Sequence, residues 1–226
     1  MLKNRGDAEA YDNYSSKALA PWDSLFLVRI RGILRRQPRP ASLLDIGTGT
    51  GVIPIRLAED LDMGQVRIVA TDTDLSMLDQ GRLRAAQAGV GERVVFEPAD
   101  AQRLPFDSAS FNVAVSRATL HHLPEKAESL REMYRVLTAG GVALVHDMRR
   151  DVTPAAFARF SQARALAGYP PTILEEKLTP DEAWTIVDDA GLAGVSQLST
   201  PTFGDSALGY EILITKPAAQ VQDARA

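Results

Sequence analysis

The chain of 226 residues contains no cysteine. This absence excludes disulfide bonds, thiolate nucleophiles and cysteine-ligated metal sites. Only three histidines are present, so no zinc-binding pattern appears, and we expect no bound metal. No apolar run approaches the roughly 20 residues that a membrane span needs, and the polar start is unlike a secretory signal. A net charge of −4 argues against a nucleic-acid partner, so we expect a cytoplasmic protein that acts on a small molecule.

The most informative segment is LLDIGTGTG, which begins at Leu43. An apolar stretch leads into Asp45 and then into glycines at positions 47, 49 and 51, and a helix-compatible run, VIPIRLAEDL, follows at once. Glycine lacks a Cβ and lets the backbone bend sharply or approach a ligand closely. A strand, a glycine turn and a helix start together place free backbone N–H groups beside a nucleoside-type ligand.

The spacing of these glycines separates two kinds of ligand. The dinucleotide fingerprint is GxGxxG, whereas this chain has GxGxG and places Val52 where the third dinucleotide glycine would lie. The carboxylate of Asp45 would repel a diphosphate and attract an ammonium group. The pattern therefore favours a nucleoside with an amino-acid-like tail. A nicotinamide-dependent oxidoreductase and a non-catalytic cofactor-binding module are the alternatives.

A second acid follows the next apolar stretch. The stretch VRIVAT, residues 66–71, leads into Asp72, which follows Gly51 by 21 residues. An acid at this distance from the glycine turn accepts the ribose hydroxyls in nucleotide-binding α/β folds. Asp74 is the alternative for this role, and we prefer Asp72 because it directly ends the strand.

Apolar runs and helix-compatible runs alternate along the chain, which predicts a parallel sheet with helices on both faces. Two final strands have no room for a helix between them and should pair antiparallel. The predicted strands are 42–46, 66–71, 93–97, 111–116, 142–147, 194–199 and 208–215. The predicted helices are 7–19, 21–36, 52–61, 75–88, 125–137, 153–167 and 180–190, with Gly140 and Gly141 ending the fifth of these.

Five motifs in order carry a resemblance to a known family. They are LLDIGTGTG, the acid Asp72, PADAQRLPF at 98–106, FNVAVSRATLHHLPE at 111–125 and LREMYRVLTAGGVALVHD at 130–147. On these motifs the chain resembles the class I S-adenosylmethionine-dependent methyltransferases of the small-molecule type, related to those of ubiquinone biosynthesis. The resemblance implies an α/β fold with a Rossmann-like, seven-stranded, mostly parallel sheet, helices on both faces and a C-terminal antiparallel hairpin.

The resemblance also implies that S-adenosyl-L-methionine is the cofactor and that the motif residues hold its parts. Asp72 would accept the ribose hydroxyls, and Asp100 and Ala101 would contact the adenine, although Asp100 could instead serve a turn. Asp45 would face the ammonium group or hold the loop, and Ser116 would orient the methionine part. The full set of expected cofactor-binding residues is Asp45, Gly47, Thr48, Gly49, Gly51, Asp72, Thr73, Asp100, Ala101, Ser116 and, folding over the cofactor, Tyr14.

The catalytic candidates are His121, His122 and Asp147. A general base is needed only if the methyl acceptor must lose a proton, and a histidine titrates near neutral pH. Neighbouring histidines in a loop are expected to point in different directions, so we do not expect the two to act together. A packing role is favoured over catalysis for this pair.

The expected domain organisation is a methyltransferase domain with two lids. Residues 1–40 would form an N-terminal helical lid, 41–216 the cofactor-binding domain with a lid insertion at about 148–192, and 217–226 a flexible tail. Aromatic residues in the lids favour an apolar or aromatic acceptor. A basic helix carries Arg29, Arg31, Arg35 and Arg36, and we interpret it as a solvated face instead of a membrane contact. We expect no integral membrane contact and a monomer or homodimer.

Overall fold

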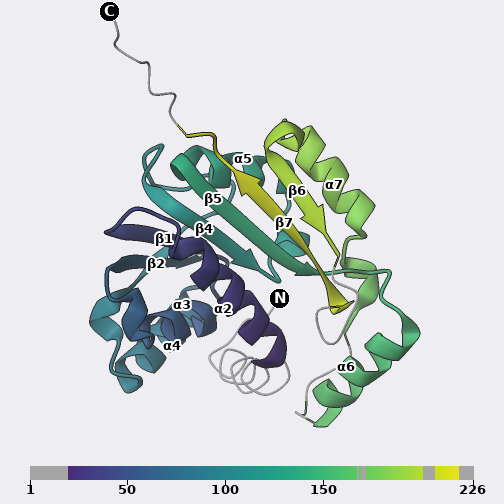
Figure 1. The fold of residues 1–226 in the computed structure, drawn as a ribbon. Coiled ribbons are helices and arrows are strands. Elements are labelled where there is room, and N and C mark those ends of the chain that lie inside the picture. Colours follow the sequence, from purple (N-terminus) through teal and green to yellow (C-terminus); the bar gives the residue numbers. More distant parts are fainter. Residues whose placement is uncertain (1–19, 167, 169–171, 201–206, 219–226) are drawn as a thin grey trace, which may run out of the picture.

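A single mixed sheet organises the molecule. The computed structural model describes residues 20–166, 168, 172–200 and 207–218. Seven strands pair in the order β3-β2-β1-β4-β5-β7-β6 (Figure 1). Their bounds are β1 Ala41–Ile46, β2 Val66–Asp72, β3 Val94–Pro98, β4 Phe111–Arg117, β5 Leu137–Met148, β6 Ser196–Ser199 and β7 Gly209–Thr215.

Among the described strands, the first five and β6 run in the same direction, and β7 runs in the opposite direction. β1 pairs with β2 and β4, β2 with β3, and β4 with β5, all parallel. β7 lies antiparallel between β5 and β6. The seven-stranded, mostly parallel sheet and the C-terminal antiparallel hairpin are therefore confirmed.

Helices cover both faces of the sheet (Figure 1). One apolar core joins the sheet to α2, α3 and α4, and a second joins the opposite face to α5 and α7. A smaller cluster holds α6 against the start of α2 and the end of β5. The helix bounds are α2 Ala20–Leu34, α3 Val52–Ala58, α4 Leu75–Gln87, α5 Lys126–Val136, α6 Pro154–Leu166 and α7 Pro180–Asp189, with short 3₁₀ turns η1 Leu61–Met63, η2 Gly91–Arg93, η3 Leu120–His122, η4 Leu174–Glu176 and η5 Ala193–Val195.

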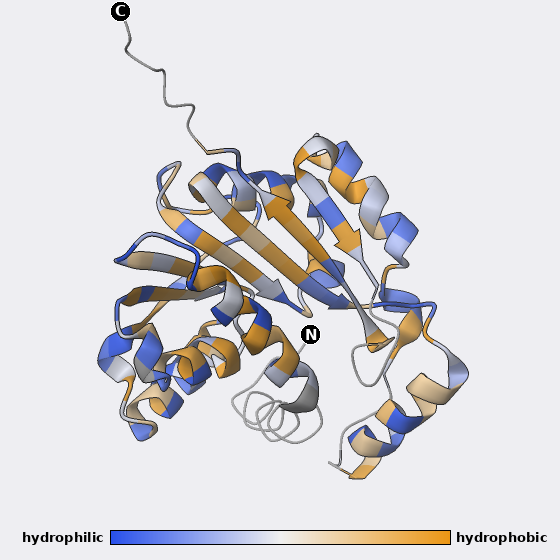
Figure 2. Cartoon of the chain, viewed as in Figure 1, coloured by the Kyte–Doolittle hydropathy of each residue, from blue (hydrophilic) through white to orange (hydrophobic). Residues whose placement is uncertain are grey.

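The strands are apolar on both sides because both of their faces are covered. In β1, Leu43 enters the core beneath α2–α4, and the next residue, Leu44, enters the core beneath α5 and α7. Neither side chain is exposed to solvent. Figure 2 shows the same arrangement as hydrophobic central strands between helices of mixed polarity.

Two helices, α4 and α7, begin where a side chain accepts a hydrogen bond from one of their first N–H groups. The carboxylate of Asp74 accepts a hydrogen bond from Ser76 N at 2.9 Å and caps α4. Thr179 and Glu182 form a reciprocal capping box at the start of α7, where Pro180 supplies a favourable φ angle. These capping residues fix the two helices at the edges of their loops.

Two predicted helix ends differ from the structure. α3 ends at Ala58, three residues earlier than expected, and η1 follows it. α5 ends at Val136, one residue before its predicted end, and Gly140 and Gly141, which were expected to stop it, lie within β5. The ammonium group of Lys216 donates to three carbonyls at this helix end, those of Tyr134, Arg135 and Leu137. A distant lysine therefore satisfies the carbonyls that a local glycine cap would otherwise serve.

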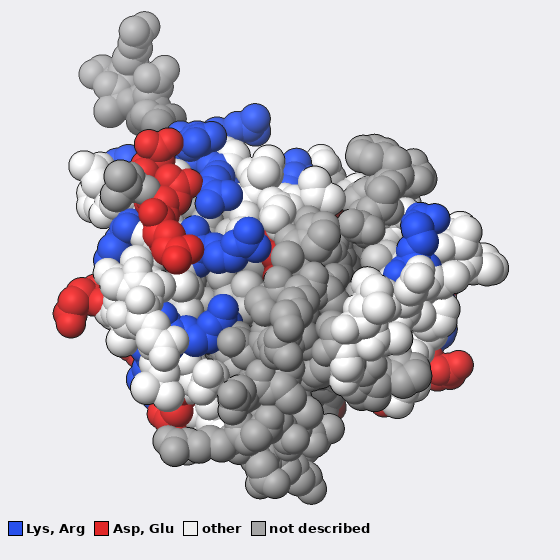
Figure 3. Space-filling view, turned by 90° about the horizontal axis from the view of Figure 1, so that it is seen from below, with Lys and Arg blue, Asp and Glu red and all other residues white. Residues whose placement is uncertain are grey.

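Helix α2 packs its apolar side into the main core. Phe26, Ile30 and Leu34 have no exposed surface and contact the cluster beneath α3 and α4. On its polar side Arg29 pairs with Glu211 at 3.2 Å and Arg31 with Asp60 at 2.6 Å. The face seen in Figure 3 carries basic and acidic groups next to one another. The arginines of this helix therefore have acidic partners from the same chain.

The predicted helix at 7–19 lies outside the described residues, and the lid and domain boundaries stay predictions. Among the residues that the structure describes, no helix is both long enough and apolar enough to cross a membrane.

Candidate functional site

The strand register brings the predicted residues to one edge of the sheet. Ile46 is the neighbour of Thr71 in β2 and of Ser116 in β4, and Ser116 is the neighbour of Val145 in β5. The residues that follow this row on each strand therefore leave the sheet at the same edge. That edge, formed by the carboxyl ends of the parallel strands, is where open α/β sheets bind ligands.

The glycine turn after β1 has the backbone conformation that its sequence predicts. Gly47, Gly49 and Gly51 have φ angles of 71°, 55° and 76°, in the region that side chains with a Cβ rarely adopt. A Cβ on Gly47 would overlap with the side chain of Thr119. The hydroxyl of Thr119 donates to the carbonyl of Gly47 at 3.2 Å. The loop after β4 therefore closes over the turn after β1, a contact that the sequence did not reveal.

Asp72 reaches from the end of β2 to this turn. Its Oδ2 accepts a hydrogen bond from Gly49 N at 2.8 Å, and its Oδ1 accepts one from Asp74 N at 3.0 Å. Burial raises the pKa of Asp72 although these amide bonds favour the ionised form. Asp74 is occupied as the cap of α4, which supports Asp72 as the ribose acid. The neighbouring Thr73 is exposed.

Asp45 lies beneath the turn and is 2% exposed. Its Oδ2 accepts a hydrogen bond from the hydroxyl of Thr48 at 2.7 Å, so it holds the loop, one of its two predicted roles. Burial raises the pKa of the Asp45 carboxyl to about 7, and the nearby charge of Asp72 adds to this rise. The hydrogen bond from the Thr48 hydroxyl and the charge of Arg117 act in the opposite direction. A cation bound here would stabilise the ionised form.

The remaining cofactor candidates divide between open and occupied positions. The Ser116 hydroxyl at the end of β4 is buried and has no hydrogen-bond partner within the described part of the chain. Asp100 is exposed and accepts hydrogen bonds from Gln102 in a turn, while the adjacent Ala101 is buried. Gly51 begins α3, and the Phe96 ring fills the space where its Cβ would lie. Tyr14 lies outside the described residues.

The catalytic candidates meet on the face of the sheet that α5 and α7 cover. Nδ1 of His121 lies 2.7 Å and 2.8 Å from the two carboxylate oxygens of Asp147, at the end of β5. Asp147 also accepts hydrogen bonds from the backbone N–H groups of His121 and Met148. Burial would raise the pKa of Asp147, but these bonds outweigh it and hold the pKa below its usual value. The ionised carboxylate fixes a proton on Nδ1 and leaves Nε2 as the acceptor.

The two histidines lie side by side, contrary to the expectation that they point in different directions. Their ring centroids are 3.8 Å apart. Nε2 of His121 also lies 2.5 Å from the Nζ atom of Lys177, a residue between η4 and α7. Partial burial and the neighbouring His121 and Lys177 charges lower the pKa of His122. Lys177 follows Asp147 by 30 residues and belongs to none of the five motifs. No local sequence signal therefore identified it.

His146 is excluded from this site because its side chain lies on the opposite face of the sheet. Trp22 in α2 donates to Nε2 of His146 at 2.6 Å, and burial lowers the pKa of His146 to about 3. Beside it, Arg117 and Asp23 form a buried ion pair. These contacts fasten α2 to β4 and β5 just behind the candidate site.

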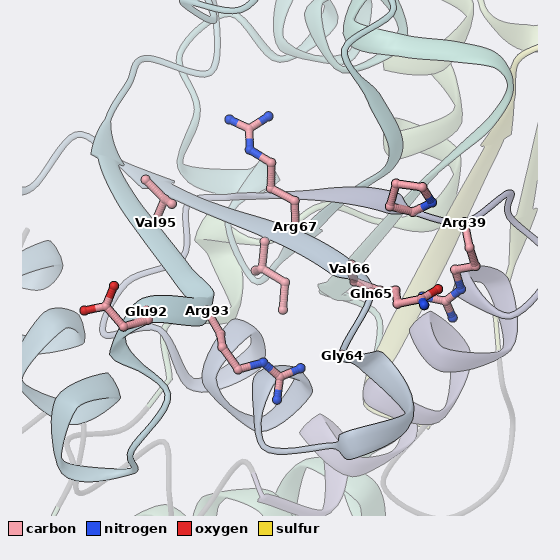
Figure 4. A pocket seen from close by; sticks show the side chains of 10 residues that line it. Arg39, Gly64, Gln65, Val66, Arg67, Glu92, Arg93 and Val95 are labelled. Atoms are coloured by element: carbon pink, nitrogen blue, oxygen red, sulfur yellow. The ribbon is translucent and has the colours of Figure 1, made fainter.

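A shallow depression of about 720 Å³ lies at the opposite edge of the sheet (Figure 4). It is lined by the first residues of β2 and β3, including Val66, whereas Asp72 ends β2. At about 3.3 Å per residue the two ends of this strand lie roughly 20 Å apart. Figure 4 shows Arg67 and Arg93 pointing to different sides of β2, so these cations do not converge on one ligand. Among the described residues, no group of three or more acidic or histidine side chains could hold a metal ion.

Comparison with known proteins agrees with the geometry of the glycine edge. A family model described as a methyltransferase domain matches residues 43–141. The demethylmenaquinone methyltransferase of Roseiflexus castenholzii is 33% identical over 180 residues, which are 72% of this chain and 72% of that protein. The 27-O-demethylrifamycin SV methyltransferase of Amycolatopsis mediterranei is 38% identical over 113 residues, which are 50% of this chain and 40% of that protein. The match thus spans less than half the length of the rifamycin relative.

Solved structures share the fold at low sequence identity. A methyltransferase from Aquifex aeolicus that depends on S-adenosylmethionine superposes with a TM-score of 0.70 at 16% identity and covers 94% of this chain and 98% of its own. A second, from Methanococcus maripaludis, gives a TM-score of 0.68 at 22% identity and covers 98% of this chain and 99% of its own. The comparisons give no support to an oxidoreductase or to a non-catalytic module.

Proposed function

The chain belongs to the class I S-adenosylmethionine-dependent methyltransferases, and from this premise we propose that it methylates a small-molecule acceptor at the carboxyl edge of its sheet. S-adenosylmethionine is the cofactor of this family, and when bound it supplies an electrophilic methyl group on a sulfonium. The observation that carries the proposal is the hydrogen bond from Gly49 N to Asp72, which joins a glycine-rich turn to an acid beside the buried carboxyl of Asp45.

The residues at this edge fit the parts of that cofactor. Asp72 uses its two oxygens for two amide bonds, and a carboxylate offers about four acceptor positions, so it can also accept ribose hydroxyls. The buried Ser116 hydroxyl lacks a partner among the described residues and can serve the methionine part. Ala101 closes the adenine side, and Asp45 offsets positive charge. Tyr14 and Thr73 stay further candidates for contact with the cofactor.

His121 is the proposed general base for an acceptor that must lose a proton. Asp147 holds its ring through Nδ1, so Nε2 is the atom that would take the proton. The imidazolium formed would be stabilised by the buried carboxylate. His122 packs against the same ring and adds bulk and a polar edge beside it. Positioning of the acceptor supplies the rest of the rate enhancement.

We further propose an apolar or aromatic acceptor, a monomer or homodimer, and a place in the cytoplasm. The two relatives named above act, by their names, on a rifamycin and on demethylmenaquinone, both small molecules. The acidic net charge and the paired arginines of α2, Arg29 and Arg31, disfavour a nucleic-acid partner.

Transfer of a labelled methyl group from S-adenosylmethionine into a small-molecule extract tests the function. We expect label in a compound of low molecular mass, with transfer abolished by excess S-adenosylhomocysteine. Label that appears only in nucleic acid, or no label although the cofactor binds, would overturn the proposal.

A further inference from the structure

Among the described residues, Lys177 makes a contact with the His121–Asp147 pair that neither the sequence motifs nor the proposed function explains. Its Nζ lies 2.5 Å from Nε2 of His121, on the side of the ring opposite to Asp147. Nε2 is the atom through which the base would act. Any acceptor that reaches this base must therefore meet or displace the ammonium group of Lys177.

The lysine backbone is already fixed by other bonds. Arg150 donates through its side chain to the carbonyl of Lys177 at 3.0 Å and through its N–H group to the carbonyl of Leu178 at 2.9 Å. The guanidinium of Arg150 also pairs with Glu182 at the start of α7. These contacts hold the segment against the end of β5. Fastening the segment therefore does not require the side chain of Lys177 to reach inward.

The charges around Lys177 leave a place for an anion. A lysine ammonium offers three donors, and in the described part of the chain Nζ has a hydrogen bond to His121 alone. Asp147 is engaged by the ring and N–H of His121 and by Met148 N. Burial lowers the pKa of Lys177, while the charges of Asp147 and Glu176 oppose this and that of Arg164 adds to it. A neutral, apolar acceptor would gain nothing from a half-buried cation, whereas an oxygen anion would offset its desolvation.

We propose that Lys177 is an acceptor-binding residue that holds an acidic hydroxyl of the methyl acceptor against Nε2 of His121. This inference rests on the proposed function and names the class of acceptor that its site takes. The hydroxyl O–H bond breaks, the proton joins Nε2, and the electron pair stays on the oxygen. That oxygen then faces the ammonium of Lys177, and Asp147 balances the imidazolium. The acceptor is thus a phenol-like or enol-like compound that reacts as its anion.

Binding of 4-nitrophenol in the presence of saturating S-adenosylhomocysteine tests the role of Lys177 without turnover. The phenolate absorbs visible light, so its ionisation on the protein can be measured directly. Lys177→Met removes the charge and keeps the length, and Lys177→Arg keeps the charge. Lys126→Met is the matched control, because Lys126 donates to the nearby carbonyl of Leu123 at 2.7 Å and has no contact with His121 among the described residues.

We expect the wild type, Lys177→Arg and Lys126→Met to bind the phenolate and to lower the pKa of the bound phenol. Lys177→Met should bind it about tenfold more weakly or worse, the size of one charge-assisted hydrogen bond. Equal binding by Lys177→Met, equal loss in Lys177→Arg, or no phenolate on the wild type at millimolar probe would overturn the inference. Calorimetry with S-adenosylhomocysteine on the same variants verifies their folding. If the wild type does not bind S-adenosylhomocysteine, that result counts against the proposed function itself.

Discussion

The two halves of the carboxyl edge are built in different ways. At the β1–β2 half, the proposed cofactor contacts come from backbone groups and a short side chain: three glycines at positive φ, and Asp72 on the amide of Gly49. At the β4–β5 half, side chains from segments distant in the sequence meet: His121, Asp147 and Lys177. The first half suits a cofactor that is always the same. In the second half, single substitutions can change the chemistry offered to the methyl acceptor. We expect cofactor binding and acceptor chemistry to be separable by mutation.

The largest effect should come from the base. His121→Gln removes the proton acceptor, so methyl transfer should fall by about 10²–10⁴-fold, the usual worth of general acid–base catalysis. His122→Gln is the matched control on the adjacent ring, and its rate should stay within about threefold of the wild type. Single-turnover rates measure both. The affinity for S-adenosylhomocysteine should not change in either variant, and a matching loss of affinity would break the separation of the two halves.

The next effect concerns the glycine turn. Gly47→Ala places a Cβ at φ 71° and against Thr119, whereas Gly89→Ala has the same φ angle with no atom within 4 Å of its Cβ. Both variants carry backbone strain of about 1–2 kcal/mol. Only Gly47→Ala adds overpacking of about 1–3 kcal/mol and should lose affinity for S-adenosylhomocysteine. Denaturant unfolding measures the stability of the two variants, and calorimetry measures their affinity for S-adenosylhomocysteine. Equal values for both variants would refute the close approach of the loops after β1 and β4.

A smaller effect separates the two acids after β2. Asp72→Ala should weaken S-adenosylmethionine binding by about 1–3 kcal/mol, because it removes an acceptor for the ribose. Asp74→Ala should lower the free energy of unfolding by about 1 kcal/mol through loss of the α4 cap and leave the affinity unchanged. Calorimetric titration of both variants decides the assignment, and the reverse pattern would give the ribose to Asp74.

The smallest effect is a pH dependence of cofactor binding. In the free protein, burial raises the pKa of Asp45 to about 7, so it is mostly protonated at pH 6 and ionised at pH 8. An ammonium group bound beside Asp45 favours the ionised form, so its binding should release a proton. The affinity for S-adenosylhomocysteine, which carries this ammonium group, should therefore rise with pH, by up to about tenfold over this range. Asp45→Asn should abolish the rise, and an affinity that falls with pH would contradict this placement.

The sequence predicted the conformation of the turn after β1 and the place of Asp72 at the end of β2 because each is set locally. LLDIGTGTG sets the turn by local backbone preference, and Asp72 follows from the end of an apolar strand. It predicted the β4–β5 half only in part. His121 and Asp147 were candidates, but their hydrogen bond joins residues 26 positions apart, and Lys177 carries no local signal. The end of α5 was predicted to within one residue, but what stops the helix was missed for the same reason, because Lys216, far along the chain, takes the place of a local cap.

The most direct measurement is a calorimetric titration of the purified chain with S-adenosylmethionine, S-adenosylhomocysteine and NAD. The account predicts saturable binding of the first two to a single site and no binding of NAD, because the turn beside Asp45 and Asp72 suits a cationic adenosine and disfavours a diphosphate. Saturable binding of NAD, or no heat with either adenosyl compound at millimolar concentration, would contradict it.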